Sequence, residues 1–521
     1  MQKHLMLSLF ISGLVIASCT DDNHGGGPNE NAAAFREVGT LQLDGGATAA
    51  EISAYDPKTK KLFVINAVKN AIDVIDMSNP TNLIDLHTPI SIQAYGTGVN
   101  SIAIKNGLLA AAIEATPKTN PGKVVVWNIR DMSVRAAVTV GSLPDMVTFS
   151  PDGNYILSAN EGEPNEDYSI DPNGSVSIIE IAKNFRVSTL DFSAFDTSAP
   201  AARYAGTLEY RVTGKPGTTL TADAEPEYIS VSADSKTAWV TLQENNTIAR
   251  VNIQTKTIER LFPLGFKDYN TAGNEIDVSD KDGGVNAARW PVYGMYMPDG
   301  IAAFTQGARN FVITANEGDS RIRPTSDEAL PGHAEGDLYN EEVRVKDILL
   351  DPFRFPDAAA LQTDSKLGRL KVTNTAGDAN RDGKYEALYA FGTRSFSIWD
   401  GSTGALVFDS GNKLETFLLD KMPSRYDDTR SDDKGVEPEN VAVGKIAGHS
   451  FAFVGLERAD AVVVVDLSNP TSPNLLQVLP TGDAPEGVLF ISAEDSPNGH
   501  SLLVTSCEGD GKINVFQAGR F

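Results

Sequence analysis

The feature that most constrains this sequence is a repeat of short apolar strands, arranged in pairs. Lys61–Asn66 and Ala71–Asp76 form one pair, which is closed by Ser-Asn-Pro. Ser450–Gly455 and Ala461–Asp466, near the other end of the chain, form a second pair that is closed by the same three residues. Such internal repeats indicate an architecture that stacks or circles one small β unit.

A further pattern precedes the paired strands. The candidate inner strands begin at Glu51, Asn100, Pro144, Pro226, Pro298, Pro438 and Pro485. An irregular unit, Leu367–Ser410, lies between the fifth and sixth of them. Units of four strands repeated in this way predict an all-β fold, a β-propeller of four-stranded blades. We favour eight blades, with seven as the alternative if the irregular unit merges with its neighbour.

Helical patterns are short and few. The best candidates for helical insertions are 356–367 and 413–422. Arg36–Leu43 has no blade ahead of it, so we expect it to supply the outer strand of the last blade and to close the ring. Closure leaves no open sheet edge between the first and last blades.

The N-terminus resembles a bacterial lipoprotein signal. Lys3 and His4 precede an apolar stretch, Leu5–Ile16, and small residues lead to Cys19. This predicts a signal peptide over 1–18, a lipid on Cys19, a flexible tether over 19–35 and a single propeller domain over 36–521. An ordinary secretory signal with an incidental cysteine is the alternative. The expected location is extracytoplasmic, in the cell envelope, with the outer membrane and its outer surface left open.

Composition excludes several classes of protein. Lys and Arg number 44 against 69 Asp and Glu, which gives a formal net charge of −25. Nucleic-acid binding needs concentrated basic residues, so no nucleic-acid partner is expected. Only two cysteines occur in 521 residues, which excludes a disulfide framework and a multi-cysteine metal site. We expect a monomer that contacts the membrane only through its lipid.

Acidic residues recur at two positions of the repeat, the start of the first strand and the end of the second. In a propeller blade these positions share one face, around the mouth of the central channel. The predicted central-face carboxylates are Glu51, Asp145, Glu161, Glu227, Asp299, Glu317, Glu439, Glu457, Glu486 and Glu508, with Glu114 and Glu244 beside them. Converging carboxylates repel one another unless they are neutralised, and hard cations such as Ca²⁺ are their natural partners. The alternative is that these acids cap backbone N–H groups in turns.

A second candidate metal site has the spacing of a calcium loop. Asp378, Asn380, Asp382 and Glu386 supply oxygen atoms at positions 1, 3, 5 and 9, and Gly383 stands at position 6. The acid at position 12 is absent. We predict a calcium loop on a β scaffold, with other divalent metals and a solvated turn as alternatives. The segment 277–284 is a looser match.

Signs of catalysis are few. No Gly-x-Ser-x-Gly, P-loop or Gly-x-Gly-x-x-Gly element occurs, and the six histidines form no metal-ligand pair. Cys507 is expected to be a buried, inert thiol. Arg321, Arg394 and Arg458 lie near predicted rim turns, where they could grip an anion or pair with nearby acids.

Longer motifs give the chain a family resemblance. Trp290–Asp299, Thr314–Arg321, Glu342–Asp347, Tyr389–Asp400 and Pro485–Gly499 resemble the bacterial choice-of-anchor I domain family. That family is similar to YVTN-type and quinoprotein-like β-propellers, and some relatives carry alkaline-phosphatase or mesenchyme-specific glycoprotein labels. The resemblance implies an anchored extracellular propeller, here with the anchor on Cys19. Cys507 stands where the family has Asn.

Two functional hypotheses follow. The first is a non-catalytic, surface-anchored propeller whose carboxylate-rich face binds a divalent cation and an unidentified extracellular ligand or protein. The second is a metal-dependent phosphoesterase that acts at the central channel.

Overall fold

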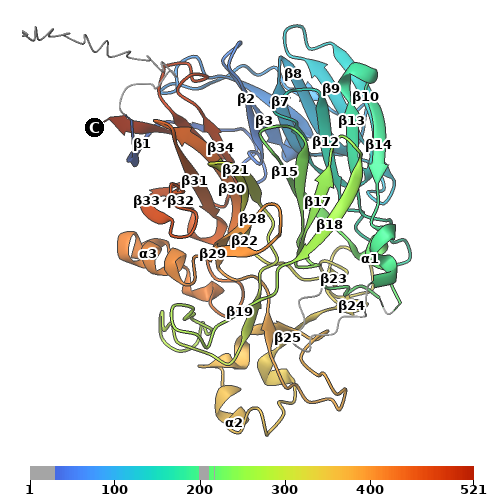
Figure 1. The fold of residues 1–521 in the computed structure, drawn as a ribbon, viewed down its shortest axis with the longest axis vertical. Helices are drawn as coiled ribbons and strands as arrows, with labels where there is room; N and C mark the ends of the chain where they lie inside the picture. Colours follow the sequence, from blue (N-terminus) through green and yellow to red (C-terminus); the bar gives the residue numbers. More distant parts are fainter. Residues whose placement is uncertain (1–29, 199–209, 216, 521) are drawn as a thin grey trace, which may run out of the picture.

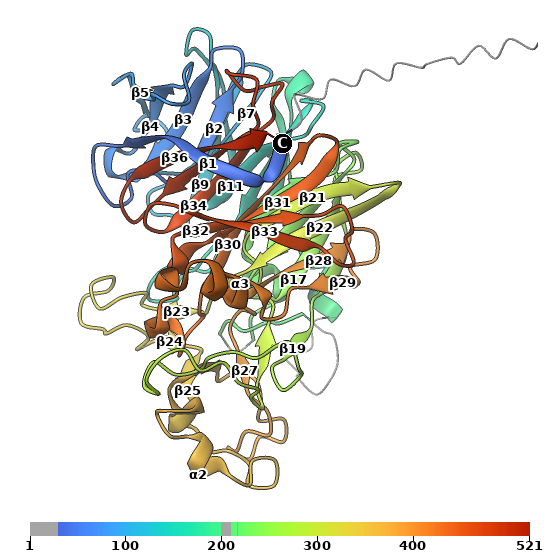
Figure 2. The same ribbon diagram turned by 90° about the vertical axis from the view of Figure 1, so that its left-hand side faces the viewer.

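The computed structural model describes residues 30–198, 210–215 and 217–520. Cys19, the predicted signal peptide and most of the predicted tether lie outside these residues. Within them, seven antiparallel sheets surround one axis as the blades of a propeller (Figures 1 and 2). The all-β propeller expected from the repeats is therefore confirmed.

The strands of the seven blades follow the chain in order. Blade 1 holds β2 (Ser53–Asp56), β3 (Lys61–Asn66), β4 (Ala71–Asp76), β5 (Ile84–Asp85) and β6 (Ile90–Ser91), and blade 2 holds β7 (Gly98–Lys105), β8 (Leu108–Glu114), β9 (Pro121–Asn128) and β10 (Val134–Ser142). Blade 3 holds β11 (Pro144–Phe149), β12 (Tyr155–Asn160), β13 (Ser175–Glu180) and β14 (Arg186–Leu190), and blade 4 holds β15 (Pro226–Val231), β16 (Thr237–Leu242), β17 (Thr247–Asn252) and β18 (Thr257–Pro263). Blade 5 holds β21 (Ile301–Gln306), β22 (Arg309–Asn316), β28 (Ser395–Asp400) and β29 (Leu406–Asp409), and blade 6 holds β30 (Pro438–Ile446), β31 (His449–Leu456), β32 (Ala461–Asp466) and β33 (Asn474–Pro480). Blade 7 holds β34 (Pro485–Ile491), β35 (Leu502–Cys507), β36 (Lys512–Arg520) and, as its outer strand, β1 (Glu30–Gln42).

The preference for eight blades is wrong. The apolar run Phe396–Trp399 of the irregular unit lies in β28, which pairs with β22 across a long insertion. Strands β28 and β29 thus complete blade 5, while β26 (Lys371–Thr373) and β27 (Tyr389–Ala390) join small sheets outside the ring. The insertion separates the second strand of blade 5 from its third, and this separation made one blade look like two.

Ring closure follows the prediction, but it begins earlier. β1 pairs with β36 in antiparallel register from Glu30 opposite Arg520 to Gln42 opposite Lys512. The strand starts at Glu30 and not at Arg36, so residues 30–35, which we expected in the tether, belong to the propeller.

The repeated turns have a common local structure. Between β3 and β4, and between β31 and β32, a single 3-10 turn ends at a left-handed residue, Asn70 (φ 47°) or Asp460 (φ 46°). Asn and Asp tolerate this conformation better than other residues with a side chain. After β4, the Asp76 carboxylate accepts a hydrogen bond from the Ser78 N–H at 2.8 Å, and Asp466 does the same for Ser468 after β32. These bonds explain the repeated Ser-Asn-Pro.

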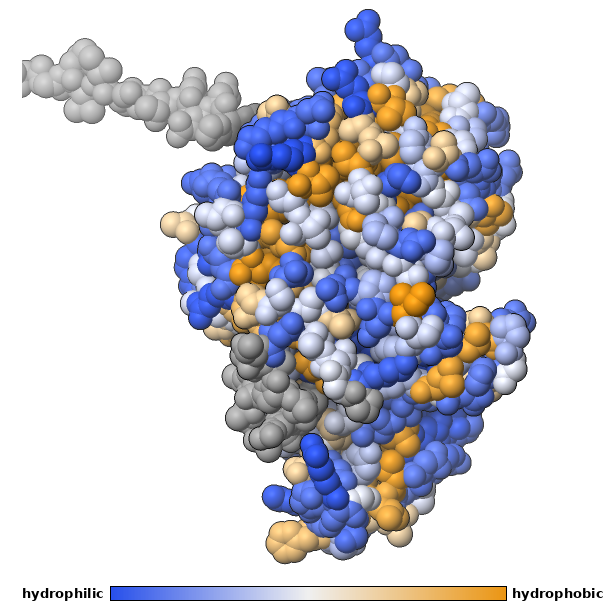
Figure 3. All heavy atoms as spheres, turned by 90° about the vertical axis from the view of Figure 1, so that its right-hand side faces the viewer, coloured by the Kyte–Doolittle hydropathy of each residue, from blue (hydrophilic) through white to orange (hydrophobic). Residues whose placement is uncertain are grey.

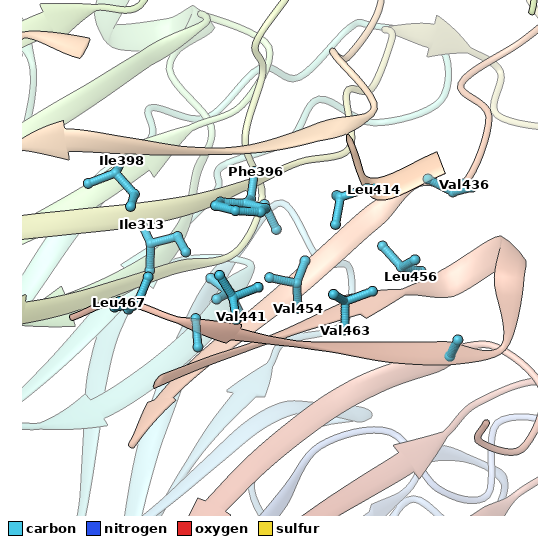
Figure 4. Close-up of a cluster of buried hydrophobic side chains, with 14 of the residues drawn as sticks. Ile313, Phe396, Ile398, Leu414, Val436, Val441, Val454, Leu456, Val463 and Leu467 are labelled. Atoms are coloured by element: carbon cyan, nitrogen blue, oxygen red, sulfur yellow. The ribbon is translucent and has the colours of Figure 1, made fainter. Parts of the chain in front are cut away.

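One apolar cluster lies between each pair of neighbouring blades, seven clusters in all, and packs the two sheets against each other. Figure 4 shows the cluster between blades 5 and 6, where Ile313 and Phe396 face Val441 and Val463. Leu414 of helix α3 (Lys413–Lys421) covers one end of it. The burial of continuous Val and Ile runs on both faces of each sheet explains why these strands lack polar alternation.

A small subdomain extends from blades 4 and 5 at the lower end of the molecule in Figure 1. It contains β19 (Phe266–Asp268), β20 (Tyr293–Met295), β23 (Ile322–Arg323), β24 (Tyr339–Asn340), β25 (Glu342–Arg344), β26, β27 and α2 (Ala358–Leu361). Its own apolar core includes Tyr269, Val345 and Leu370. Helix α1 (Leu220–Asp223) precedes blade 4. Both predicted helical insertions are thus present, as α2 and α3.

Short 3-10 helices connect many of these elements. Their bounds are η1 (Ala67–Lys69), η2 (Ile181–Lys183), η3 (Ser193–Ser198), η4 (Val345–Asp347), η5 (Leu367–Arg369), η6 (Pro423–Arg425), η7 (Asp428–Arg430) and η8 (Glu457–Ala459). No helix among the described residues is both long and apolar enough to cross a membrane. On the face in Figure 3, hydrophobic residues occur in small groups between hydrophilic ones.

Candidate functional site

The first and second strands of each blade position the predicted acids. Pro144 at the start of β11 lies opposite Asn160 at the end of β12, and Pro485 at the start of β34 lies opposite Cys507 at the end of β35. The start of one strand and the end of the next therefore share an edge. Because inner strands of neighbouring blades pack around the axis, these edges meet at one mouth of the channel.

All seven blades contribute to a narrow throat on the axis. The throat is a cavity of about 50 Å³, lined in blade order by Ile52, Asn100, Asp145, Tyr228, Asp299, Asn440 and Glu486, with Ser101 and Met146. Three carboxylates, two amides and two hydroxyl groups thus converge on a space that holds a single ion or water-sized group. Asn100, Tyr228 and Asn440 were not among the predicted site residues.

A bulge repeated at the start of several inner strands directs these side chains toward the axis. Inner strands β7, β11, β15, β30 and β34 each carry one extra residue at their start relative to the paired strand. In β11 and β34 the extra residue follows the proline directly and is Asp145 or Glu486. In β15 and β30 the irregular stretch is one residue longer, and Tyr228 or Asn440 lines the throat. Such bulges redirect side chains out of the regular alternation.

Most of the central carboxylates have no basic partner. Among the described residues, ion pairs reach none of eight predicted acids: Glu51, Asp145, Glu161, Glu227, Asp299, Glu439, Glu486 and Glu508. Glu227 is only 8% exposed. One carboxylate oxygen of Glu439 is buried without a hydrogen-bond partner. The structure therefore brings these acids together without neutralising them.

Burial and mutual repulsion raise the pKa values of this group. Burial, then the charges of Glu508 and Asp145, raises the pKa of Glu51 to about 7. Burial, then Glu163 and Glu114, raises the pKa of Asp145 to about 7. The pKa values of five further carboxyls lie well above their ordinary range, with burial as the largest cause and neighbouring acids next: Glu161, Glu227, Asp299, Glu439 and Glu486. A bound cation would reverse this balance.

Two outer arcs of acidic residues on the same face lie next to basic side chains of the protein. The Lys434 ammonium pairs with Glu317 and lies 3.3 Å from the fully buried carboxylate of Glu437. Ligand oxygens of Glu317, Glu437 and Glu457 lie within 4.8 Å of one another, a spacing that suits a metal. Lys434 pairs with two of these acids, while Arg430 pairs with Glu437 and Arg458 with Glu457, so three basic side chains supply the counter-charge for this arc. Burial still raises the pKa of Glu457 to about 7.

Arg321 supplies one positive charge to the other arc. Its guanidinium is 3% exposed and lies 3.2 Å from Glu225, 3.4 Å from Asp223 and 3.9 Å from Glu244. Arg394 is equally buried and donates to the backbone carbonyls of Asp277 and Ser431 at 2.7 and 2.8 Å. Both guanidinium groups are engaged by acids or carbonyl groups of the protein, which is the alternative to anion binding stated for them. Arg458, with 43% of its side chain exposed, remains available.

The predicted calcium loop folds as a compact turn around its acidic residues. Ligand oxygens of Asp378, Asp382 and Glu386 lie within 4.8 Å of one another. Asp378 accepts hydrogen bonds from the N–H groups of Asp382 and Gly383 at 3.1 and 2.9 Å, and Gly383 has a φ of 83°. The Asn380 amide donates to Glu386 at 2.6 Å. The four predicted residues therefore do come together.

In the looser match at 277–284, the acidic side chains are hydrogen-bonded or ion-paired within the protein. Asp277 accepts hydrogen bonds from the N–H groups of Ser279 and Asn286 at 3.2 and 2.6 Å, and Asp280 pairs with Arg369.

Cys507 is a free, buried thiol, and burial raises its pKa to about 12, which agrees with the expected inert role.

Two basic residues, Lys434 and Arg211, were not predicted from the sequence. Lys434 lies four residues before the Pro438 that starts β30, so a basic residue beside the acidic repeat could have identified it. Arg211, whose side chain forms a fully buried ion pair with Glu341 at 2.6 Å, lies in a stretch without repeats. Nothing in the sequence indicates that Arg211 and Glu341 form a pair.

Comparison with known proteins identifies the family. The choice-of-anchor I domain model matches residues 51–470, which is most of the chain. The chain belongs to the choice-of-anchor I family. The resemblance noted from the motifs is thereby confirmed, and membership indicates a propeller associated with the cell surface.

Two curated relatives are more distant. Over 189 residues the chain is 28% identical to Gigasin-3a of Magallana gigas, covering 30% of this chain and 66% of that protein. Over 335 residues it is 25% identical to the mesenchyme-specific cell surface glycoprotein of Strongylocentrotus purpuratus, covering 57% of this chain and 42% of that protein. The matched region thus spans less than two thirds of either relative.

Solved structures with a similar shape are remote in sequence. Hydrazine synthase of Kuenenia stuttgartiensis aligns with a TM-score of 0.47 and 12% identity, over 92% of this chain and 98% of that chain. The WD40 repeats of RRP9 align with a TM-score of 0.46 and 10% identity, over 94% and 99%. At these scores the assignment of the fold rests on the sheet topology alone.

Proposed function

We propose that this choice-of-anchor I protein is a non-catalytic, lipid-anchored propeller of the cell envelope. Its carboxylate-rich face binds a divalent cation, best calcium, and an extracellular ligand. The lipid would be carried by Cys19. The observation that carries the proposal is the group of carboxylates at the channel mouth, buried or partly buried, that forms no ion pair within the described chain.

The chemistry of the throat favours a hard cation. Asp145, Asp299 and Glu486 supply carboxylate oxygens, and Asn100 and Asn440 supply amides. Calcium takes six to eight oxygen ligands in flexible geometries, whereas transition metals prefer nitrogen and sulfur. The volume of about 50 Å³ admits one ion with little water. A cation bound there would offset the repulsion that raises the neighbouring pKa values.

The loop 378–386 is the second cation site of the proposal. Its oxygen atoms are preorganised by backbone N–H groups, as in known calcium loops, but they are more exposed than the throat. We therefore expect weaker and faster-exchanging binding at the loop than at the throat.

Calorimetric titration of EDTA-treated full-length protein in detergent tests the proposal. Calcium should bind at two sites of different affinity. Asp145→Asn with Glu486→Gln should remove the tighter site, and Asp378→Asn with Asp382→Asn should remove the weaker one. Asp420→Asn, which changes an acid with 68% of its side chain exposed, is the matched control. Absence of calcium binding in the unmodified protein would refute the cation role.

The phosphoesterase hypothesis has less support. The Glu317, Glu437 and Glu457 group has ligand oxygens spaced for a metal and lies beside Arg458, but the Lys434 ammonium already pairs with two of its acids. A hydrolytic metal needs an open coordination position. Calcium-dependent hydrolysis of a phosphate ester by the same preparation would favour that hypothesis over ours.

A further inference from the structure

A polar cavity lies at the edge of the carboxylate-rich face. Its volume is about 620 Å³. The loop after α3, the turn between β31 and β32, and the segment between β33 and β34 form its walls. Cavities of 300–1,000 Å³ are typical of sites for small ligands.

Three guanidinium groups line this cavity, from Arg425, Arg430 and Arg458. Their side chains are 33%, 29% and 43% exposed. Two of them crowd one partner, because Arg430 Nε lies 2.9 Å and Arg458 Nε 3.5 Å from the same buried Glu437 carboxylate. Burial lowers the pKa of Arg458, but the charges of Glu457 and Glu437 outweigh burial and raise it, so the Arg458 guanidinium stays charged and able to hold an oxyanion.

The existing ion pairs of these arginines leave them able to exchange partners. Arg425 Nη1 lies 2.9 Å from Asp460, and Arg458 Nη1 lies 3.0 Å from Glu457. Partly exposed pairs of this kind contribute little net stability, so a ligand can replace them at small cost. Arginine can bind carboxylate, sulfate and phosphate groups through two parallel hydrogen bonds.

Acidic residues in the same walls restrict the ligand further. Four acids also line the cavity, and their carboxylates accept hydrogen bonds: Asp427, Glu457, Asp460 and Asp483. They disfavour a ligand of dense negative charge, such as a polyphosphate. They suit a ligand that combines one isolated oxyanion with several hydroxyl donors. An acidic peptide offers carboxylates but few donors beyond its amides, whereas an acidic saccharide offers both kinds of group.

We infer that this cavity binds an acidic saccharide, with its oxyanion on Arg425 and Arg458 and its hydroxyl groups on the surrounding aspartates. The inference names the ligand of the proposed ligand-binding face. It depends on the proposed ligand-binding role of this face. It does not depend on a bound cation, because the arginine side chains supply the positive charge that holds the oxyanion. The oxyanion is a uronate carboxylate or a sulfate ester, and the two sources are separated by experiment.

Full-length protein in detergent is titrated with a galacturonate oligosaccharide and, separately, with a sulfated oligosaccharide, each with calcium and with EDTA. Neutral dextran and polyglutamate are the control ligands. Arg425→Gln with Arg458→Gln should weaken binding at least about tenfold, as expected for loss of charge-assisted hydrogen bonds. Arg458→Lys should weaken it less than Arg458→Gln, because it keeps the charge but loses the two-pronged geometry. Arg354→Gln, at an exposed residue of the subdomain, should leave binding unchanged.

Binding of either acidic saccharide that the double variant abolishes supports the inference, and the tighter arm identifies the oxyanion. Unchanged melting temperatures of the variants exclude unfolding as the cause. The inference is overturned if neither saccharide binds, if dextran or polyglutamate binds as well, or if the double variant binds like the unmodified protein. Saccharide binding in EDTA without any calcium binding would refute the cation proposal and leave this one intact.

Discussion

Neutralising one throat carboxylate should stabilise the metal-free protein at alkaline pH. Asp145→Asn keeps the shape of the side chain and removes its charge. The pKa of Asp145 rises from 3.8 to about 7 in the folded protein, chiefly through burial. At about 1.4 kcal/mol for each pKa unit, holding this group ionised at pH 8 costs the folded state about 4 kcal/mol. That is an upper limit, because neighbouring acids respond when one charge is removed.

The sign of the pH dependence follows from linkage. The folded state holds the Asp145 proton more tightly than the unfolded state does, so this group lowers stability as pH rises from about 4 through 7. The variant lacks this loss. Its advantage should therefore fall from about 4 kcal/mol at pH 8 to about 2 kcal/mol at pH 5, and disappear below pH 4.

Urea denaturation in EDTA at pH 5 and pH 8 measures both quantities. Asp420→Asn serves as the control, because that side chain is 68% exposed and should give a small difference at either pH. Added calcium should stabilise the unmodified protein more than the variant. The reasoning is refuted if Asp145→Asn gives no gain at pH 8, or if its gain is the same at both pH values.

Three further predictions concern the frame around the throat. Lys434→Met should destabilise the protein by up to about 3 kcal/mol in urea denaturation, because it removes one of the positive charges beside the buried Glu437 while Arg430 keeps its ion pair with that acid. Lys421→Met, at a side chain 51% exposed, should change little. Gly318→Ala should cost more stability than Gly448→Ala in thermal denaturation; both glycines have φ near 85°, but only at Gly318 would the added Cβ lie 2.1 Å from a backbone atom, the nitrogen of Gly392. Equal losses at the two glycines would contradict the contact argument. Cys507 should resist alkylation in the native protein and react once it is unfolded, as measured by peptide mass mapping, and rapid native labelling would disprove its burial.

Much of the fold is readable from the sequence because the repeat is expressed in residue types. The Pro-acid pairs recur at the starts of several inner strands, and the Ser-Asn-Pro turns recur with the same local hydrogen bonds in blades 1 and 6. The number of blades was not readable, since a long insertion divides blade 5 between β22 and β28. An insertion of that length resembles a blade whenever it contains short strands of its own.

Only some of the residues that line the throat could be predicted from the sequence, for a different reason. Asp145 and Glu486 stand out as acids at repeat positions, and the structure brings them to the axis. Tyr228 and Asn440 reach the same cavity from one residue further along, because their strands have a longer irregular stretch after the proline. The length of a bulge depends on how the strand packs against its neighbours, and residue types alone do not encode it.

Arg321 and Arg394 mark a further limit. Each lies near a turn where an exposed guanidinium would suit an anion, but tertiary packing buries both among acids or carbonyl groups. Arg458 escapes burial because its turn borders the cavity after α3. Exposure, which decides between these roles, comes from segments far away in the chain.

The closing strand has a mechanical consequence. β1 pairs with β36 of blade 7, and the Phe35 backbone also exchanges two hydrogen bonds with the Gln477 side chain of blade 6, at 2.9 and 2.8 Å. Any tension applied through the residues before Glu30 enters the propeller at the outer edges of two blades at once. Because that tension runs along an antiparallel ladder, many hydrogen bonds must fail together before the ring opens. The pairing of β1 with β36 and Gln477 therefore resists separation of β1 from blades 6 and 7 by a force applied at Glu30.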